Sequence, residues 1–106
     1  MRWTLGPWLF FAVAACATPL RDAESAFEEG QYPLAKHRLA ALERASAGFA
    51  APDRAAYALY RGLTYGALGD AARAREWLAV AVELRRALIQ IRQHTSRQRQ
   101  AVRVHA

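Results

Sequence analysis

The sequence predicts an all-α protein with two short helical hairpins and an extended C-terminal helix. Alanine and arginine dominate its composition and runs of β-branched residues are absent, which favours helices over strands. Apolar residues recur every three or four positions, and single glycines and prolines separate these stretches. With 106 residues, of which 54% are hydrophobic, the chain is expected to form one small folded domain.

The first element is an apolar N-terminal segment that has the parts of a bacterial export signal. Arg2 is followed by an uncharged run that reaches Leu20, and small residues precede Cys16. The sequence Val-Ala-Ala-Cys at 13–16 resembles the lipobox of bacterial lipoproteins. This resemblance implies a signal peptide at 1–15, a lipid on the Cys16 thiol, and a lipidated N-terminus with a spacer at 16–19.

Two alternatives to lipidation stay open for this segment. Ordinary signal cleavage would leave a protein without a lipid, and an uncleaved segment would act as an anchor, although it is shorter than the ~20 apolar residues that a span needs. In lipoproteins, the residue after the cysteine influences sorting, and Ala17 in place of Asp implies the periplasmic face of the outer membrane. The covalent lipid would then be the protein's only cofactor.

The next elements form a first hairpin. Residues 20–29 are expected to form a helix that ends at Gly30, and Pro33 fits the first turn of a second helix that continues to about Ser46. Gly48 and Phe49 indicate a helix stop with an apolar residue folding back onto the last turn. At Pro52 the chain is then expected to continue in a new direction.

A second hairpin follows, with its turn at Gly69 and Asp70. Gly69 suits the left-handed conformation that ends a helix, and Asp70 suits the N-cap of the next one. This last helix has no Gly or Pro to stop it before residue 92. We therefore expect a helical domain at 20–92, followed by a basic C-terminal tail at 93–106.

The second hairpin resembles a tetratricopeptide repeat. Gly62 and Tyr65 match the G-x₂-Y of that family's signature, Ala74 matches its alanine, and Leu78 stands at its aromatic position. An unrelated helical hairpin with a similar turn is the alternative. Gly69 lies 39 residues after Gly30, which exceeds the family's period of 34 residues and places an insertion between the hairpins.

The alignment also shows where the chain departs from the family. Asp22 and Arg61 both stand where tetratricopeptide repeats usually carry leucine. These two charged residues leave room for an ion pair between the first helices of the two hairpins.

Tetratricopeptide proteins bind peptides or helices in a groove that the first helix of each repeat lines. Carried over to this chain, the resemblance implies a partner-binding groove made by Arg21, Glu24, Phe27, Glu28, Leu59, Tyr60 and Leu63. The last helix also carries a long apolar stripe, made by Trp77, Leu84, Leu88 and Ile91. This stripe predicts a helix interface, through self-association or a partner helix, unless it packs back onto the second hairpin.

Positive charge is concentrated at the C-terminus. Six arginines and no acidic residue follow Leu84, whereas eight basic and nine acidic residues lie between Cys16 and Leu84. The tail is either a contact for anionic groups or a solvated end. It lacks the interleaved aromatic residues that stack on bases, so nucleic acid is not the expected partner.

The residues do not predict an enzyme. His37, His94 and His105 lie far apart without companion ligands, which predicts no metal site, and the single glycines form no phosphate-binding loop. The expected function is that of a membrane-tethered periplasmic adaptor that binds an envelope protein, in assembly of a secretion system or a type IV pilus, by resemblance to small lipoproteins with such repeats. A regulator of cell-wall enzymes and a cytosolic nucleic-acid-binding protein are the alternatives.

Overall fold

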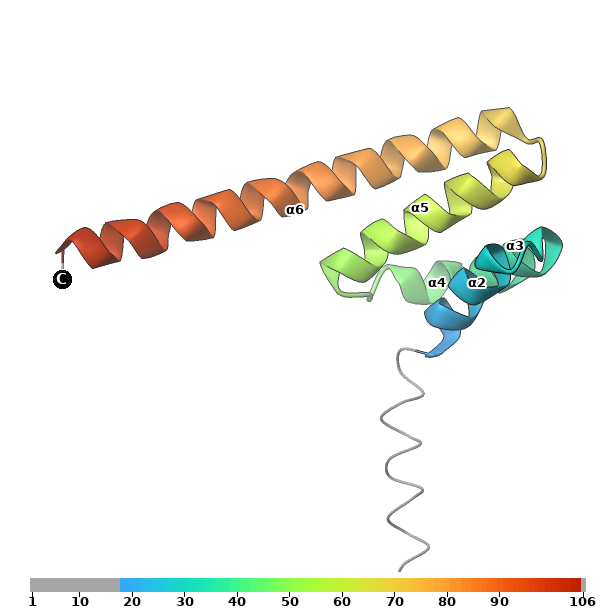
Figure 1. The fold of residues 1–106 in the computed structure, drawn as a ribbon, viewed down its shortest axis with the longest axis horizontal. Helices are drawn as coiled ribbons and strands as arrows, with labels where there is room; N and C mark the ends of the chain where they lie inside the picture. Colours follow the sequence, from blue (N-terminus) through green and yellow to red (C-terminus); the bar gives the residue numbers. More distant parts are fainter. Residues whose placement is uncertain (1–17, 106) are drawn as a thin grey trace, which may run out of the picture.

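The computed structural model describes residues 18–105, and all five of its secondary-structure elements are helices (Figure 1). They are α2 (Thr18–Glu28), α3 (Tyr32–Ala41), α4 (Glu43–Ser46), α5 (Ala51–Ala67) and α6 (Ala71–His105). Helices α2 and α3 form the first hairpin, and α5 forms the second with the first part of α6. The prediction of an all-α fold with two hairpins and a long C-terminal helix is confirmed. Cys16 and the expected signal segment lie outside the described residues.

The turns of the two hairpins have the same geometry. Gly30 and Gly69 both adopt a positive φ, +80° and +85°, in the left-handed region that favours glycine. After each glycine, the next amide donates to a carbonyl five residues earlier, from Gln31 to Ala26 at 2.8 Å and from Asp70 to Tyr65 at 2.9 Å. This bond pattern is the Schellman motif, and the turns predicted at both glycines are therefore present.

The second helix of the first hairpin is interrupted, contrary to the prediction of one helix from Pro33 to Ser46. Leu42 leaves helical geometry, with φ −90° and ψ 0°, and separates α3 from the short α4. Its side chain packs against the core, and the following residue, Glu43, reaches Arg61 of α5. Gly48 does not adopt a positive φ, although Phe49 folds back against the core as expected.

The core lies where α2, α3 and α5 meet. Leu20, Ala23, Leu39 and Tyr57 are buried together, and Phe49 and Trp77 pack against them. The Tyr57 ring meets the rings of both Phe49 and Trp77 edge to face, with centroids 6.0 and 5.9 Å apart. Aromatic residues from the loop before α5 and from α6 thus close a core that is otherwise made of small residues.

Helices α5 and α6 approach each other closely at Gly62. A Cβ atom on this glycine would lie 2.7 Å from Cγ of Leu78 and 3.0 Å from its backbone nitrogen. Ala58, Ala74 and Ala81 are also buried at this crossing. Small side chains therefore allow α5 and α6 to pack closely against each other at this crossing.

Helix α6 is twice as long as its neighbour, with 35 residues against 17 in α5. At a rise of about 1.5 Å per residue it extends roughly 50 Å, and its last part passes beyond the end of α5 into solvent (Figure 1). We call residues 89–105 the C-terminal arm, and every residue from 89 to 104 is exposed. The segment expected as a separate tail at 93–106 therefore continues α6 without a break as far as His105. In the described part of the chain, no helix is both long and apolar enough to cross a membrane.

Candidate binding surface

The buried guanidinium of Arg61 joins three helices of the body, α4, α5 and α6. Its Nη1 donates to Oε1 of Glu43 and to the hydroxyl of Tyr57, and its Nη2 donates to the hydroxyl of Tyr65, each at 3.1 Å. Its Cζ lies 4.4 Å from the centroid of the Trp77 ring, within range of a cation–π interaction. The residue itself is only 7% exposed. Arg61 is therefore a structural hub and not part of an open site.

The predicted pairing of Arg61 with Asp22 is wrong. Arg61 forms its ion pair with Glu43, whose position after the break at Leu42 turns the carboxylate toward α5. Asp22 is exposed, and its carbonyl accepts a hydrogen bond from Arg38. The carboxylate that neutralises Arg61 comes from α4, which the sequence did not separate from α3.

Tyr57 connects this hub to the first hairpin. Its hydroxyl donates to the carbonyl of Leu39 at 2.9 Å while it accepts from Arg61. Burial raises the pKa of Tyr57, although the charge of Arg61 and its hydrogen bond act in the opposite direction. The phenol therefore stays protonated and holds α5 against the end of α3.

A surface formed by α2 and α5 carries the side chains predicted for partner binding. Phe27 meets the ring of Tyr60 edge to face, with centroids 5.6 Å apart, and the hydroxyl of Tyr60 donates to Oε1 of Glu28 at 3.1 Å. Leu59 and Leu63, which flank Tyr60 on α5, are each 37% exposed. These contacts bring apolar and acidic groups from both helices to one surface, which we call the α2–α5 face.

At its other end the α2–α5 face leads into a pocket of about 250 Å³. Arg21 and Glu24 of α2 and Asp53 of α5 supply its charged groups. Burial raises the pKa of Glu24; Arg21 opposes this effect, and the negative charges of Glu28 and Asp53 add to it. Three carboxylates and one guanidinium thus give this face a negative balance.

The structure places the seven predicted groove residues in two groups. Phe27, Glu28 and Tyr60 are in contact, with Leu59 and Leu63 exposed beside them. Arg21 and Glu24 line the pocket. The sequence analysis missed Asp53 as a member of the same pocket. Asp53 lies seven residues before Tyr60, which is two helical turns away on the same side of α5. This spacing could have identified Asp53 from the sequence.

The four residues predicted for a C-terminal interface do not form one open stripe. Trp77 packs against the chain's own core, and Leu84 and Leu88 are partly buried along α6. Ile91, on the C-terminal arm, is 61% exposed. The apolar stripe is therefore covered by α5 as far as α5 extends, and only its last part is open.

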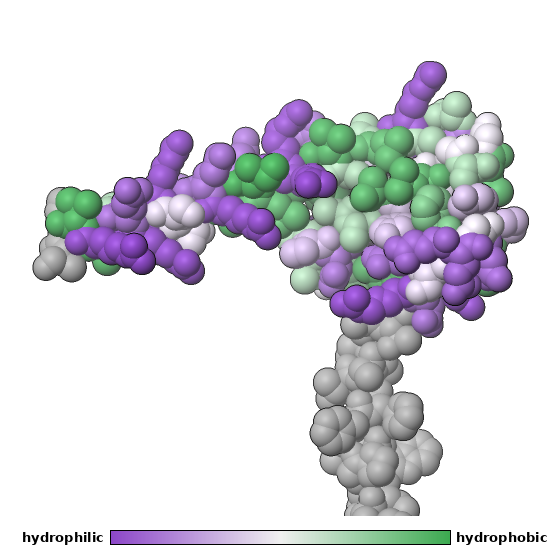
Figure 2. Space-filling view, viewed as in Figure 1, coloured by the Kyte–Doolittle hydropathy of each residue, from purple (hydrophilic) through white to green (hydrophobic). Residues whose placement is uncertain are grey.

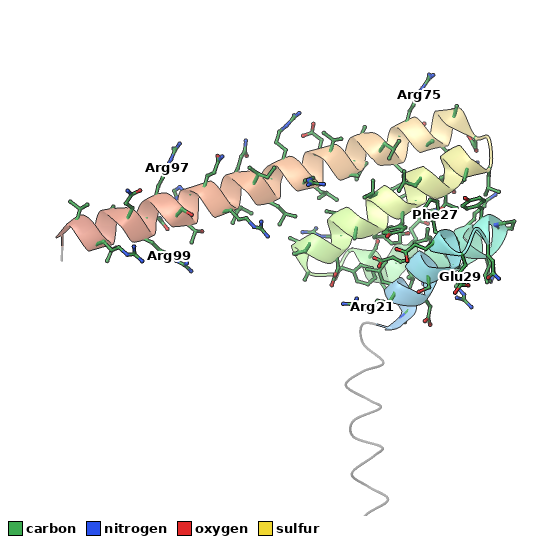
Figure 3. The ribbon with its side chains drawn as sticks, viewed as in Figure 1. Arg21, Phe27, Glu29, Arg75, Arg97 and Arg99 are labelled. Carbon is green, nitrogen blue, oxygen red and sulfur yellow. The ribbon has the colours of Figure 1, made fainter. Side chains whose placement is uncertain are left out.

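The C-terminal arm is basic on the side that continues the α5-packing surface. Arg92, Arg99 and Arg103 follow each other at spacings of seven and four residues, which puts them on the same side of the helix as Leu78 and Ala81. Figure 3 shows Arg99 on the α5 side of α6 and Arg97 on the opposite side. Hydrophilic residues cover much of the arm on the face shown in Figure 2, with separate apolar patches near its start and its end.

Within residues 18–105 no group of three or more potential metal ligands comes together. The arrangement of charged and apolar groups described above suits the binding of another macromolecule. We compared the chain with protein-family models, with curated proteins and with solved structures, and none of the three comparisons found a match.

Proposed function

We propose that this protein is a membrane-tethered docking module, lipidated on Cys16, that binds an envelope protein through the α2–α5 face. The single observation that carries the proposal is that face itself. Exposed Leu59 and Leu63 lie beside the Phe27–Tyr60 pair, which Glu28 holds in place. An apolar centre with aromatic side chains and a charged edge is the composition of a protein-binding surface.

The repeat of the hairpin geometry supports a tetratricopeptide-like scaffold for this face. Gly30 and Gly69 end the first helices of the two hairpins in the same way, and Ala23 and Gly62 are buried at equivalent positions. The first helices, α2 and α5, are the two that form the proposed binding face. In tetratricopeptide proteins the corresponding helices line the ligand groove, which is the resemblance that motivates the assignment.

The tether rests on the sequence around Cys16. Because α2 begins at Thr18, one residue separates the cysteine from the first helix. A lipid on Cys16 would thus hold the body within roughly 10 Å of the membrane surface, given a reach of about 3.5 Å per residue. Such a position suits the capture of a protein that is itself in or near the membrane, as in the assembly of a secretion system or a pilus.

Lipidation and docking can be tested separately. Metabolic labelling with an alkyne-bearing palmitate is expected to label the wild-type chain and not Cys16→Ser. An unlabelled, full-length precursor in the cytosol would contradict the tether. For docking, a photoreactive residue in place of Leu63 is expected to crosslink an envelope protein in cells. The same residue in place of Glu76, an exposed position on α6, is the matched control. Equal crosslinking from both positions would contradict the assignment of the face.

A further inference from the structure

We infer that the C-terminal arm of one copy docks on the α2–α5 face of another copy. The inference rests on the face described under the proposed function, but it names a second copy of this chain as an occupant. It is carried by the separation of charge within the body, by a matching spacing of opposite charges, and by the direction in which the arm leaves the molecule.

In the described part of the chain, the arginines of the arm form no ion pair. Among residues 18–105 there are three ion pairs, Arg61–Glu43, Arg73–Asp70 and Arg86–Glu83, and none of them involves residues 89–104. No acidic residue follows Glu83 in the sequence. The arm therefore presents a set of uncompensated positive charges beside the exposed apolar side chains of Ile91 and Val102, which are 61% and 69% exposed.

The α2–α5 face offers the complementary groups. Glu24, Glu28 and Asp53 form no ion pair in the described part of the chain. The position of Glu28 is fixed by the hydrogen bond from Tyr60. Leu59 and Leu63, on α5 near Tyr60, supply exposed apolar surface. This combination matches the arginines and the apolar residues of the arm.

The spacing of the opposite charges also agrees. Arg99 and Arg103 are four residues apart on α6, and Glu24 and Glu28 are four residues apart on α2. Each pair therefore lies about 6 Å apart along its helix, so an arm laid along α2 can bring both arginines to both carboxylates at once. Binding to nucleic-acid phosphates would not require the arginine spacing to match a pair of carboxylates. The arm also carries no aromatic residue for base stacking.

The arm can dock on the α2–α5 face of another molecule but not on the α2–α5 face of its own molecule. Helix α6 is continuous from Ala71 to His105 and carries the arm away from α2 (Figure 1). Reaching the chain's own α2–α5 face would require α6 to break, and no Gly or Pro is present within it. Pairing between two arms through this side is disfavoured, because Arg92, Arg99 and Arg103 would face like charges. The contact is therefore head to tail, with different surfaces on the two copies.

The test uses two differently tagged copies of the full-length chain, co-expressed and purified in a mild detergent. Wild-type copies are expected to co-purify. Arg99→Glu in both copies is expected to lower the recovered fraction about tenfold, as for a close interfacial charge pair. Arg97→Glu makes the same charge change on the opposite side of α6 and is expected to leave recovery unchanged. Circular dichroism checks that both variants keep their helix content.

A charge exchange provides the stricter test. Copies with Arg99→Glu and Arg103→Glu are expected to lose association with themselves, as are copies with Glu24→Arg and Glu28→Arg. In a mixture of the two kinds, the unaltered arm of one meets the unaltered face of the other, and the two altered surfaces also carry opposite charges. Co-purification should therefore recover. The inference would be overturned if the wild-type protein were monomeric, if Arg97→Glu and Arg99→Glu had equal effects, or if the mixture showed no recovery. Binding of duplex DNA by the arm without self-association would also overturn it. Because crosslinking from Leu63 to an envelope protein is scored separately in the Arg99→Glu variant, failure of this inference is distinguishable from failure of the proposed function.

Discussion

The guanidinium of Arg61 lies over the indole of Trp77, with its Cζ 4.4 Å from the ring centroid. Arg61 stands on α5 at a position where the tetratricopeptide pattern has leucine, and Trp77 stands on α6. Burial of a charged side chain is tolerated here because two tyrosine hydroxyls, one carboxylate and an aromatic ring surround it. The pair thus joins α5 and α6 through a polar network.

Removal of Arg61 is expected to destabilise the fold. Arg61→Ala removes a side chain that is buried between α5 and α6 and takes the shared donor from two tyrosine hydroxyls, so we expect a loss of about 2–4 kcal/mol in the free energy of unfolding. Glu43→Ala should cost less than about 1 kcal/mol, because the Glu43 side chain is 65% exposed. Urea unfolding followed by circular dichroism measures both. Equal losses would show that the ion pair, and not burial, dominates the network.

Substitution of Gly62 tests the close contact between α5 and α6. A Cβ at this position would lie 2.7 Å from Cγ of Leu78, so Gly62→Ala has to move one helix or the other. We expect a net loss of about 1–2 kcal/mol, since overpacking exceeds the gain in helix propensity.

Gly66 on the same helix is the matched control. A Cβ there would meet Cβ of Ala74 at an ordinary 3.8 Å, and the residue is exposed. Gly66→Ala should therefore raise stability by up to about 1 kcal/mol. A stabilising Gly62→Ala in thermal unfolding would contradict the packing described for this crossing.

The buried phenol of Tyr57 predicts a loss of stability at alkaline pH. Burial raises its pKa in the folded state, so above the ordinary tyrosine pKa of about 10 the unfolded chain holds fewer protons than the folded one. The stability that the protonated Tyr57 contributes should therefore be fully present below this pH. It should be lost as pH rises through the folded pKa. Tyr57→Phe should be less stable at neutral pH, because the Leu39 carbonyl loses its donor, and should decline less steeply. Parallel pH profiles for both proteins, measured by urea unfolding, would contradict this prediction.

The two hairpin turns should each be sensitive to a side chain at their glycine. Gly69→Ala forces an L-residue into φ +85° and is expected to cost roughly 1–2 kcal/mol, and Gly30→Ala, at φ +80°, should behave alike. Gly48→Ala is the control. Gly48 lacks a positive φ, and a Cβ would lie 3.6 Å from the carbonyl oxygen of Ala45. Thermal melting of the three variants should rank Gly48→Ala as the mildest, and a different order would contradict the turn geometry.

Local chemistry made part of this fold predictable. Glycines that end helices and prolines in first turns identified both hairpins, and the absence of either residue after Asp70 indicated a long last helix. The break at Leu42 could not be predicted, because neither Gly nor Pro marks it and the residues on both sides favour helix. The burial of Arg61 depends on Tyr57, Tyr65 and Glu43 meeting it in space, and periodicity along one helix gives no information on such a meeting.

The candidate site was predictable to a similar extent. Its apolar and acidic members on α2 followed from the repeat alignment, whereas the pocket between α2, the α4–α5 loop and the first turn of α5 depends on how the insertion between the hairpins folds. Likewise, the sequence indicated positive charge at the C-terminus. Only the end of α5 determines where α6 ceases to be covered and the arginines become a free surface.

Hydrogen exchange of residues 89–104 would report whether a ligand is bound to this part of α6. None of the other described helices covers this stretch, so within residues 18–105 only its internal backbone bonds protect it from solvent. Helical segments of this length are marginal without packing, and their amide protons should exchange with deuterium far sooner than those at the Gly62 crossing. A ligand seated on the arm would slow that exchange, whatever its identity, and the residues that slow most would outline its footprint.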